Sequence, residues 1–174
     1  MSNTKVTIQK GCKYSHAWTA LAAARISMGF IFLWAFFDKT FGLGYATEPA
    51  KAWIEGGSPT TGFLTGASQS SGLFADFFGS LVGQGWVDYL FMIGLVGIGV
   101  LLLLGIGLRI AAASGTVLLV LMWLAAMPLA TNPVIDDHIV YAILLWVIAF
   151  GRRNISLVDW WLSIPLVKKN TWLW

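Results

Sequence analysis

Four long apolar stretches constrain this chain more than any other feature of its sequence. They cover residues 17–37, 87–108, 110–130 and 134–150. An α-helix needs about 20 apolar residues to cross the hydrocarbon of a bilayer, with a range of about 17–25. Charged residues make up only 11% of the chain, against about 25% in soluble domains. The sequence therefore predicts an all-α integral membrane protein, a single domain over residues 1–174 built as a bundle of four transmembrane helices.

Basic residues indicate how the bundle is oriented. Eight of them fall on one side of an alternating four-span topology, namely Lys5, Lys10, Lys13, Arg109, Arg152, Arg153, Lys168 and Lys169. Only Lys39 and Lys51 fall on the other side, and Arg25 lies inside a span. Because Lys and Arg are concentrated in cytoplasmic loops, both termini are expected in the cytoplasm, with the protein in the plasma membrane. The basic residues form no single patch, so the expected partner is the lipid bilayer and not nucleic acid.

The connections between the stretches differ in length. Residues 38–86 form a long extracytoplasmic loop that contains short apolar segments of its own, which is typical of a cap. Residues 154–174 form an aromatic and basic tail that is expected to lie along the inner membrane interface. Within the second stretch, Gly94, Gly97 and Gly99 favour close approach of a neighbouring helix.

Five ionisable residues are expected at the outer end of the bundle and are the candidate catalytic residues: Asp38, Lys39, Asp136, Asp137 and His138. Histidine exchanges protons in the physiological range, so a shared pocket could relay protons or hold an anionic substrate. The simpler interpretation is structural. Lys39 suits the C-terminus of one helix, and the acidic pair Asp136–Asp137 suits the first turn of another. No metal site is expected, because His16 and His138 are predicted on opposite sides, and the sequence has no haem or nucleotide motif.

Arg25 is predicted about eight residues inside the first span. A membrane-embedded arginine costs at least about 2.5 kcal/mol, so it should have a partner. Asp159 is the one acidic residue expected on the inner side, and we therefore predict a structural ion pair between Arg25 and Asp159. The alternative is that Arg25 extends to a lipid phosphate.

Several segments together resemble one known family. These are the segment from Arg25 to Lys39, the loop pieces 41–47 and 57–63, the segment from Asn132 to His138, and Ser156-Leu-Val-Asp159. In this order they resemble the DoxX/DoxD family of membrane proteins, and especially its DoxD-like branch, over residues 17–162. The resemblance implies a four-helix membrane fold. It also implies a subunit of thiosulfate:quinone oxidoreductase, which oxidises thiosulfate to tetrathionate, passes electrons to quinone and works with a second subunit.

The leading functional expectation is therefore a membrane subunit of a quinone-linked oxidoreductase, with quinone as the electron acceptor. Quinone is expected to enter between aromatic-rich spans near Trp34 and Phe37. Two other functions stay open. One is a non-catalytic anchor that assembles soluble redox partners, and the other is a transporter of protons or small solutes. A second oxidoreductase subunit or further copies of this chain are the candidate protein partners.

Overall fold

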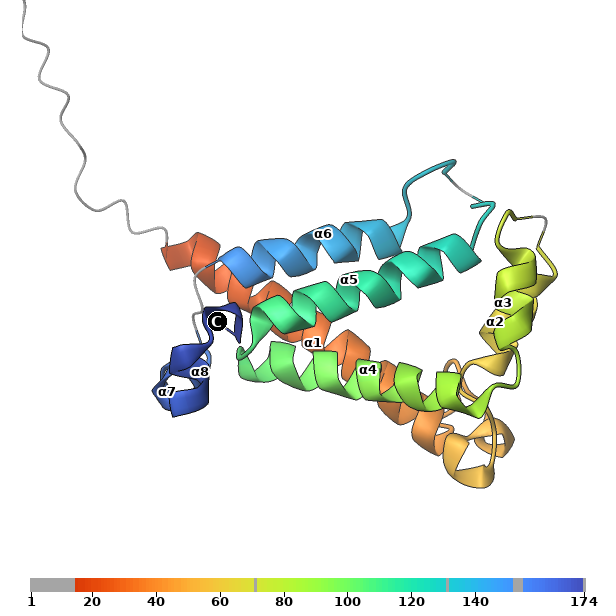
Figure 1. The fold of residues 1–174 in the computed structure, drawn as a ribbon, viewed down its shortest axis with the longest axis horizontal. Helices are drawn as coiled ribbons and strands as arrows, with labels where there is room; N and C mark the ends of the chain where they lie inside the picture. The colour runs from red at the N-terminus through yellow and green to blue at the C-terminus, as the bar shows by residue number, and fades with distance from the viewer. Residues whose placement is uncertain (1–14, 71, 131, 152–154, 174) are drawn as a thin grey trace, which may run out of the picture.

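The computed structural model describes residues 15–70, 72–130, 132–151 and 155–173, and helices account for all of its regular structure over that part of the chain. Four helices form the body of the molecule (Figure 1). They are α1 (Ser15–Phe41), α4 (Gly85–Leu104), α5 (Leu108–Ala125) and α6 (Asp137–Phe150). The shorter helices are α2 (Thr61–Ser68), α3 (Ala75–Leu81), α7 (Val158–Ser163) and α8 (Pro165–Lys169), with 3₁₀ turns η1 (Pro49–Lys51), η2 (Trp53–Glu55) and η3 (Thr171–Leu173). The predicted all-α class is confirmed for these residues.

The four main helices pack as a bundle around one apolar core. α1 lies against α4 and α6, and α5 lies against α4 and α6. Met28, Met92, Ile98, Leu108 and Leu145 are among the buried residues of this core. Many large apolar side chains instead point outward from the bundle. Such a surface suits contact with lipid and does not suit contact with water. Three helices, α1, α4 and α5, are long and apolar enough to cross a membrane.

The fourth predicted span is shorter than expected. α6 has 14 residues, which corresponds to about 21 Å of helix. It begins at Asp137 because Asp136 caps it, accepting a hydrogen bond from the Ile139 N–H at 3.3 Å. Residues 134–136 therefore precede the helix.

Glycine and proline move other boundaries away from their predicted positions. α4 ends at Leu104, just before Gly105, and α5 begins after Gly107. Both glycines have the left-handed backbone conformation. The turn between these helices thus lies at residues 105–107, before Arg109. α5 stops at Ala125, shortly before Pro128, since the residue preceding a proline disfavours helical backbone. α1 continues to Phe41, which places Asp38 and Lys39 in its last two turns.

α1 and α4 are in close contact where two glycines meet. A Cβ on Gly29 would lie 3.1 Å from the Gly99 carbonyl oxygen, and a Cβ on Gly99 would lie 3.1 Å from the Gly29 carbonyl oxygen. A side chain at either position would push the two helices apart. The expected role of Gly99 in close packing is confirmed, whereas a Cβ on Gly97 would meet nothing within 4 Å.

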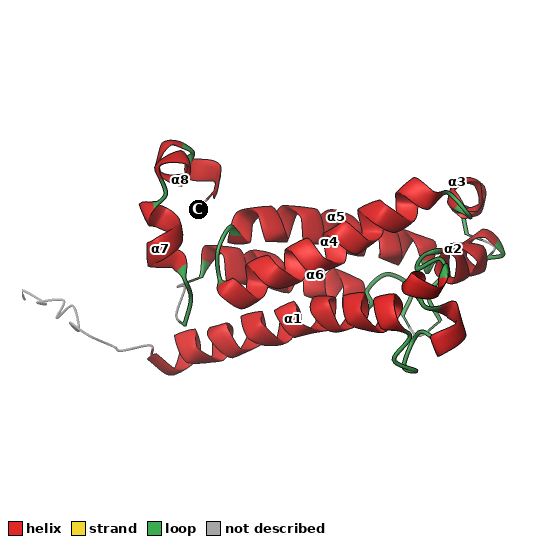
Figure 2. Ribbon diagram, turned by 90° about the horizontal axis from the view of Figure 1, so that it is seen from below, coloured by secondary structure: helices red, strands yellow, loops and turns green. Residues whose placement is uncertain are grey.

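Residues 42–84, between α1 and α4, fold into a cap at one end of the bundle. α2 and α3 pack together, and Leu64, Ala67 and Phe78 form a second small core with Ala125 at the end of α5. We call this end, with α2, α3 and the last turn of α1, the loop end. The opposite end, with the 105–107 turn, α7 and α8, is the tail end. Figure 2 shows α7 and α8 standing off from the bundle at that end.

Candidate functional site

A cavity of about 290 Å³ opens beside the last three turns of α1 at the loop end. Its walls are mostly apolar and come from α1 and from the loop that follows it. The lining residues are Phe30, Ile31, Trp34, Ala35, Asp38, Lys39, Tyr45 and Ala46. Phe30 stacks on Trp34 with ring centroids 5.9 Å apart, and the Tyr45 ring meets Trp34 edge-on at 5.1 Å. The cavity therefore combines an aromatic wall with one acidic and one basic residue.

Asp38 fixes the loop that closes this cavity. Its side chain is only 1% exposed. One carboxylate oxygen accepts a hydrogen bond from the Tyr45 N–H at 3.2 Å, and the other accepts one from the Ala46 N–H at 2.9 Å. Gly42, with φ of 62°, ends α1 and allows the chain to turn back over Asp38. Asp38 thus holds Tyr45 in place against Trp34.

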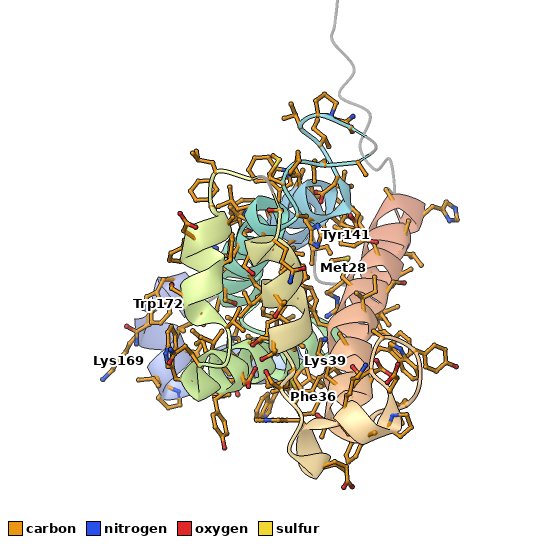
Figure 3. All side chains as sticks on the ribbon, turned by 90° about the vertical axis from the view of Figure 1, so that its right-hand side faces the viewer. Met28, Phe36, Lys39, Tyr141, Lys169 and Trp172 are labelled. Carbon is orange, nitrogen blue, oxygen red and sulfur yellow. The ribbon has the colours of Figure 1, made fainter. Side chains whose placement is uncertain are left out.

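Lys39 is the basic group of the cavity. Its Nζ atom lies 5.8 Å from the centre of the Phe91 ring on α4, within the range of a cation–π interaction. Figure 3 looks onto the loop end and shows Lys39 on the side of α1 that faces the other helices. Lys51, the other basic residue expected on this side, instead forms an exposed ion pair with Glu48 at 3.0 Å. Lys39 is therefore placed to bind an electronegative atom of a ligand in the cavity.

Asp136, Asp137 and His138 form a second, separate group at the start of α6. The His138 Nδ1 atom lies 2.6 Å from a carboxylate oxygen of Asp136 and 3.7 Å from one of Asp137. Partial burial raises the pKa of the Asp136 carboxyl. The hydrogen bonds from His138 and from the Ile139 N–H, with the charge of His138, lower that pKa by more than burial raises it, so the pKa lies below its ordinary value.

The ligand atoms of these three residues lie within 4.8 Å of one another, and each belongs to a residue type that binds metals. The sequence-based expectation of no metal site compares His138 only with His16, on the opposite side of the predicted bundle. In the described structure, Asp136 serves as the helix cap and already holds the His138 ring, and the Asp137 side chain is 66% exposed. The three residues are therefore organised as the start of a helix.

The single pocket expected from the sequence is corrected to these two groups. Asp38 and Lys39 line the α1 cavity, and residues 136–138 do not contribute to it. In Figure 1 the start of α6 and the end of α1 lie at the same end of the bundle but on opposite edges of it. Of the two residues expected to contact quinone, Trp34 lines the cavity. Phe37 does not, and instead packs between Phe36 and Phe41.

Asp88 is an important buried acid that the sequence analysis did not select. It lies in the first turn of α4 and is 8% exposed. One of its oxygens accepts hydrogen bonds from the Ser58 hydroxyl at 2.8 Å, the Thr60 N–H at 3.1 Å and the Thr60 hydroxyl at 2.6 Å. The signal available in the sequence was a carboxylate at a helix N-terminus together with the Ser-Pro-Thr-Thr turn of residues 58–61.

Arg25 is buried, as expected of an arginine inside a span, but the predicted ion pair with Asp159 is not among the ion pairs of the described residues. The Arg25 Nη2 atom instead donates a hydrogen bond to the backbone carbonyl of Ile155. The guanidinium lies over Gly105 at the C-terminus of α4, where the helix dipole favours a positive charge. The Leu157 N–H also donates to the Leu104 carbonyl at 2.9 Å. Arg25 therefore docks the start of the tail through a backbone carbonyl, four residues before Asp159.

No family model, no curated protein and no solved structure matches the chain.

Proposed function

We propose that this chain is a four-span protein of the plasma membrane with both termini in the cytoplasm. In this topology α6 is the fourth span, and residues 42–84 form an extracytoplasmic cap. Two observations support it. α6 is apolar and packs between α1 and α5 as a full member of the bundle. Arg109, Lys168 and Lys169 all lie at the tail end, which becomes the cytoplasmic end under the positive-inside rule.

Within the membrane, the proposed function is that of a subunit of a quinone-linked oxidoreductase. The observation that carries this proposal is the α1 cavity, in which Trp34 and Tyr45 provide aromatic surfaces beside the charged pair Asp38 and Lys39. Phe30, Ile31 and Tyr45 are partly or largely exposed, so the cavity can be entered from the lipid-facing side of α1. A planar, apolar molecule dissolved in the bilayer fits such an entrance.

The residues of the cavity fit a quinone ring in three respects. Trp34 and Phe30 provide surfaces on which a ring can stack. The Lys39 ammonium can donate a hydrogen bond to a carbonyl oxygen, and its contact with Phe91 holds it at the cavity. Asp38 is already bonded to two backbone N–H groups, so its part is to position Tyr45 and to balance the charge of Lys39. A quinone bound there would accept two electrons and two protons.

Thiosulfate is the electron donor that the resemblance to the DoxX/DoxD family implies. Two thiosulfate ions joined through a sulfur–sulfur bond give one tetrathionate ion and release two electrons, the number that one quinone accepts. In the proposal, a second subunit supplies the thiosulfate site. Asp38, Asp88, Asp136 and Asp137 make the described loop end acidic, which disfavours a dianion there.

Quinone binding tests the proposal directly. The purified chain in lipid nanodiscs would be titrated with a short-tailed ubiquinone analogue, and the dissociation constant measured for the wild type and for Lys39→Met and Trp34→Leu. Loss of a hydrogen bond to a charged group costs about 1.5–3 kcal/mol, so Lys39→Met should weaken binding by roughly 10- to 100-fold. Trp86→Leu is the matched control, since Trp86 is exposed at the start of α4 and does not line the cavity.

A second measurement addresses the electron donor. Membranes that contain the chain would be supplied with thiosulfate and the same quinone, with and without a candidate second subunit, and quinone reduction followed by absorbance. Thiosulfate-dependent reduction that is lost in Lys39→Met supports the proposal. Wild-type chain that binds no quinone would rule the proposal out, and recovery of soluble redox proteins with the chain would then favour the anchoring function.

A further inference from the structure

A second, larger hollow lies at the tail end, outside the site described above. It has a volume of about 630 Å³ and is formed where the start of α5, the end of α6 and η3 meet. Arg109, Ile110 and Ala113 line it from α5, Trp146 and Phe150 from α6, and Trp172 from η3. Arg109 is its one charged lining residue, and the other five are apolar or aromatic.

The polar end of this hollow suits an anionic phosphate group. Arg109 lies in the first turn of α5, where the helix dipole also favours a negative charge. A guanidinium can form two parallel hydrogen bonds with a phosphodiester. Trp172 is exposed at the rim, as is typical of tryptophan at the headgroup level of a membrane. Figure 3 shows Lys169 and Trp172 on the same side of the molecule.

The apolar part of the hollow continues along the bundle toward the middle of the membrane. On α6, Trp146 stacks on Phe150 with ring centroids 5.5 Å apart, and Ile143 and Val147 follow on the same helix face and are exposed. On α5, Val117 and Leu121 follow Ala113 at intervals of four residues and are also exposed. Two apolar stripes therefore run from the hollow between α5 and α6, along the path that an acyl chain of a lipid takes.

The tail that forms the third wall is held in place by its own contacts. The Trp161 indole N–H donates to the Leu173 carbonyl at 2.9 Å, which ties η3 to α7. The Asn170 side chain donates to the Leu166 carbonyl at 2.8 Å, and Val167 and Leu173 are buried. Since η3 also packs against α5, the tail completes the hollow as a defined wall.

We propose that this hollow is a binding site for one anionic phospholipid, with the phosphate on Arg109 and one acyl chain between α5 and α6. The hollow has a cation at its rim, then an aromatic wall, and then an apolar exit toward the membrane core. This order matches the phosphate, the interfacial region and the acyl chain of such a lipid. The site is separate from the α1 cavity, which lies at the opposite end of the bundle, and it does not depend on the quinone proposal.

Native mass spectrometry of the purified, delipidated chain tests this assignment. The chain would be mixed with phosphatidylglycerol or with phosphatidylcholine of the same acyl chains, and the bound fraction compared. Phosphatidylglycerol should bind about tenfold more tightly to the wild type, and Arg109→Gln should remove this preference. Lys169→Gln is the matched control, because it removes one exposed positive charge at the same end but outside the hollow.

Two further arms separate a lipid from a free anion. Ala113→Trp keeps Arg109 but fills the apolar part of the hollow, and it should also lower phosphatidylglycerol binding about tenfold. Excess inorganic phosphate should not displace the lipid. Equal binding of both lipids to the wild type, retained preference in Arg109→Gln, unchanged binding in Ala113→Trp, or displacement by inorganic phosphate would each overturn the proposal. Circular dichroism and gel filtration of each variant would confirm that it is folded.

Discussion

Thr60 donates two hydrogen bonds to the same carboxylate oxygen of Asp88, one from its backbone N–H at 3.1 Å and one from its hydroxyl at 2.6 Å. Both residues are buried, and the contact joins the start of α2 to the first turn of α4. A buried carboxylate is tolerated only when such donors replace water. The cap formed by residues 42–84 is thus anchored to the bundle by a polar contact as well as by its small apolar core.

Replacing Asp88 by alanine should loosen this cap. The Asp88→Ala variant leaves the Thr60 and Ser58 donors without their acceptor, at a cost of about 1.5–3 kcal/mol. We expect a lower thermal midpoint in detergent and faster proteolysis within residues 42–84. Asp76→Ala, which removes an exposed acid from the first turn of α3, is the control and should behave like the wild type. Equal proteolysis rates in the two variants would contradict the anchoring role.

Gly105 should tolerate no side chain, for two separable reasons. Its φ of 70° costs a non-glycine residue about 1–2 kcal/mol, and a Cβ there would overlap the Arg25 guanidinium. Gly56 has a φ of 86° but open space around it, so Gly56→Ala carries the backbone strain alone. We expect Gly105→Ala to lower the thermal midpoint clearly more than Gly56→Ala does. Similar decreases in thermal midpoint in the two variants would mean that displacing the Arg25 guanidinium costs little stability.

The crossing of α1 and α4 depends on Gly99. A Cβ at this position would lie 2.6 Å from the Leu33 side chain and 3.1 Å from the Gly29 carbonyl, so Gly99→Val must separate the helices. Overpacking of this kind costs about 1–3 kcal/mol. Gly97→Val changes the same residue type two positions away, where a Cβ meets nothing within 4 Å, and should have little effect. Thermal unfolding of both variants in the same detergent provides the comparison.

The start of α6 should depend on pH through Asp136. Its pKa in the folded protein lies below the unfolded value of about 3.9, because His138 and the Ile139 N–H favour the carboxylate. The stabilisation is therefore fully present above that unfolded pKa and is lost as the pH falls through the folded pKa. Asp136→Asn keeps a good helix cap but removes the charge. It should be less stable than the wild type near neutral pH, and the two should converge as the pH falls from about 4 through the lower folded pKa of Asp136.

The control for this pH dependence is Asp137→Asn. Asp137 lies 3.7 Å from the same histidine nitrogen but is largely exposed and does not cap the helix. Its variant should keep most of the pH profile of the wild type. A wild-type profile that is already reproduced by Asp136→Asn would show that another group controls the acid response.

Cysteine labelling tests the proposed topology. In a Cys12→Ser background, Glu55→Cys in the cap should react with an impermeant maleimide added to intact cells. Lys169→Cys in α8 should react only after the cells are opened, because it lies at the proposed cytoplasmic end. The reverse pattern would invert the orientation. Labelling of both positions in intact cells would show that an even number of spans separates them, as when α4 and α5 cross but α6 does not.

The apolar stretches predicted the main helices well because burial in lipid depends on residue type alone. The exact ends of the helices are set by single residues. The effect of each such residue can be judged only when the backbone conformation around it is known. Gly105 and Gly107 turn the chain before Arg109, the residue between the two apolar stretches 87–108 and 110–130. Asp136 makes α6 begin later than the apolar stretch that starts at residue 134. The folded cap was expected from its short apolar segments, but its two anchors, Asp38 and Asp88, were not recognised as such.

The candidate site was predicted less well, since distance across a bundle is not encoded in local sequence. Asp38 and His138 were both expected at the loop end, yet α1 and α6 carry them to different edges of it. The partner of Arg25 was sought among acidic side chains, whereas a backbone carbonyl of Ile155 fills that role. Every residue has a backbone carbonyl, so the sequence does not indicate which carbonyl accepts the hydrogen bond from Arg25. Trp34, expected near quinone, and Lys39, expected in the outer pocket, line the same cavity because both lie on α1.

In the proposed four-span topology, the shortness of α6 has a mechanical consequence for the surrounding bilayer. At about 21 Å, α6 falls about 9 Å short of the usual hydrocarbon thickness of about 30 Å, whereas α1, with 27 residues, reaches about 40 Å. Lipids must compress along one flank of the molecule and stretch or let the helix tilt along the other, at a fraction of a kcal/mol per ångström. In that topology, two copies with their thin flanks toward each other would share one region of compressed lipid, which would favour their association without any direct contact.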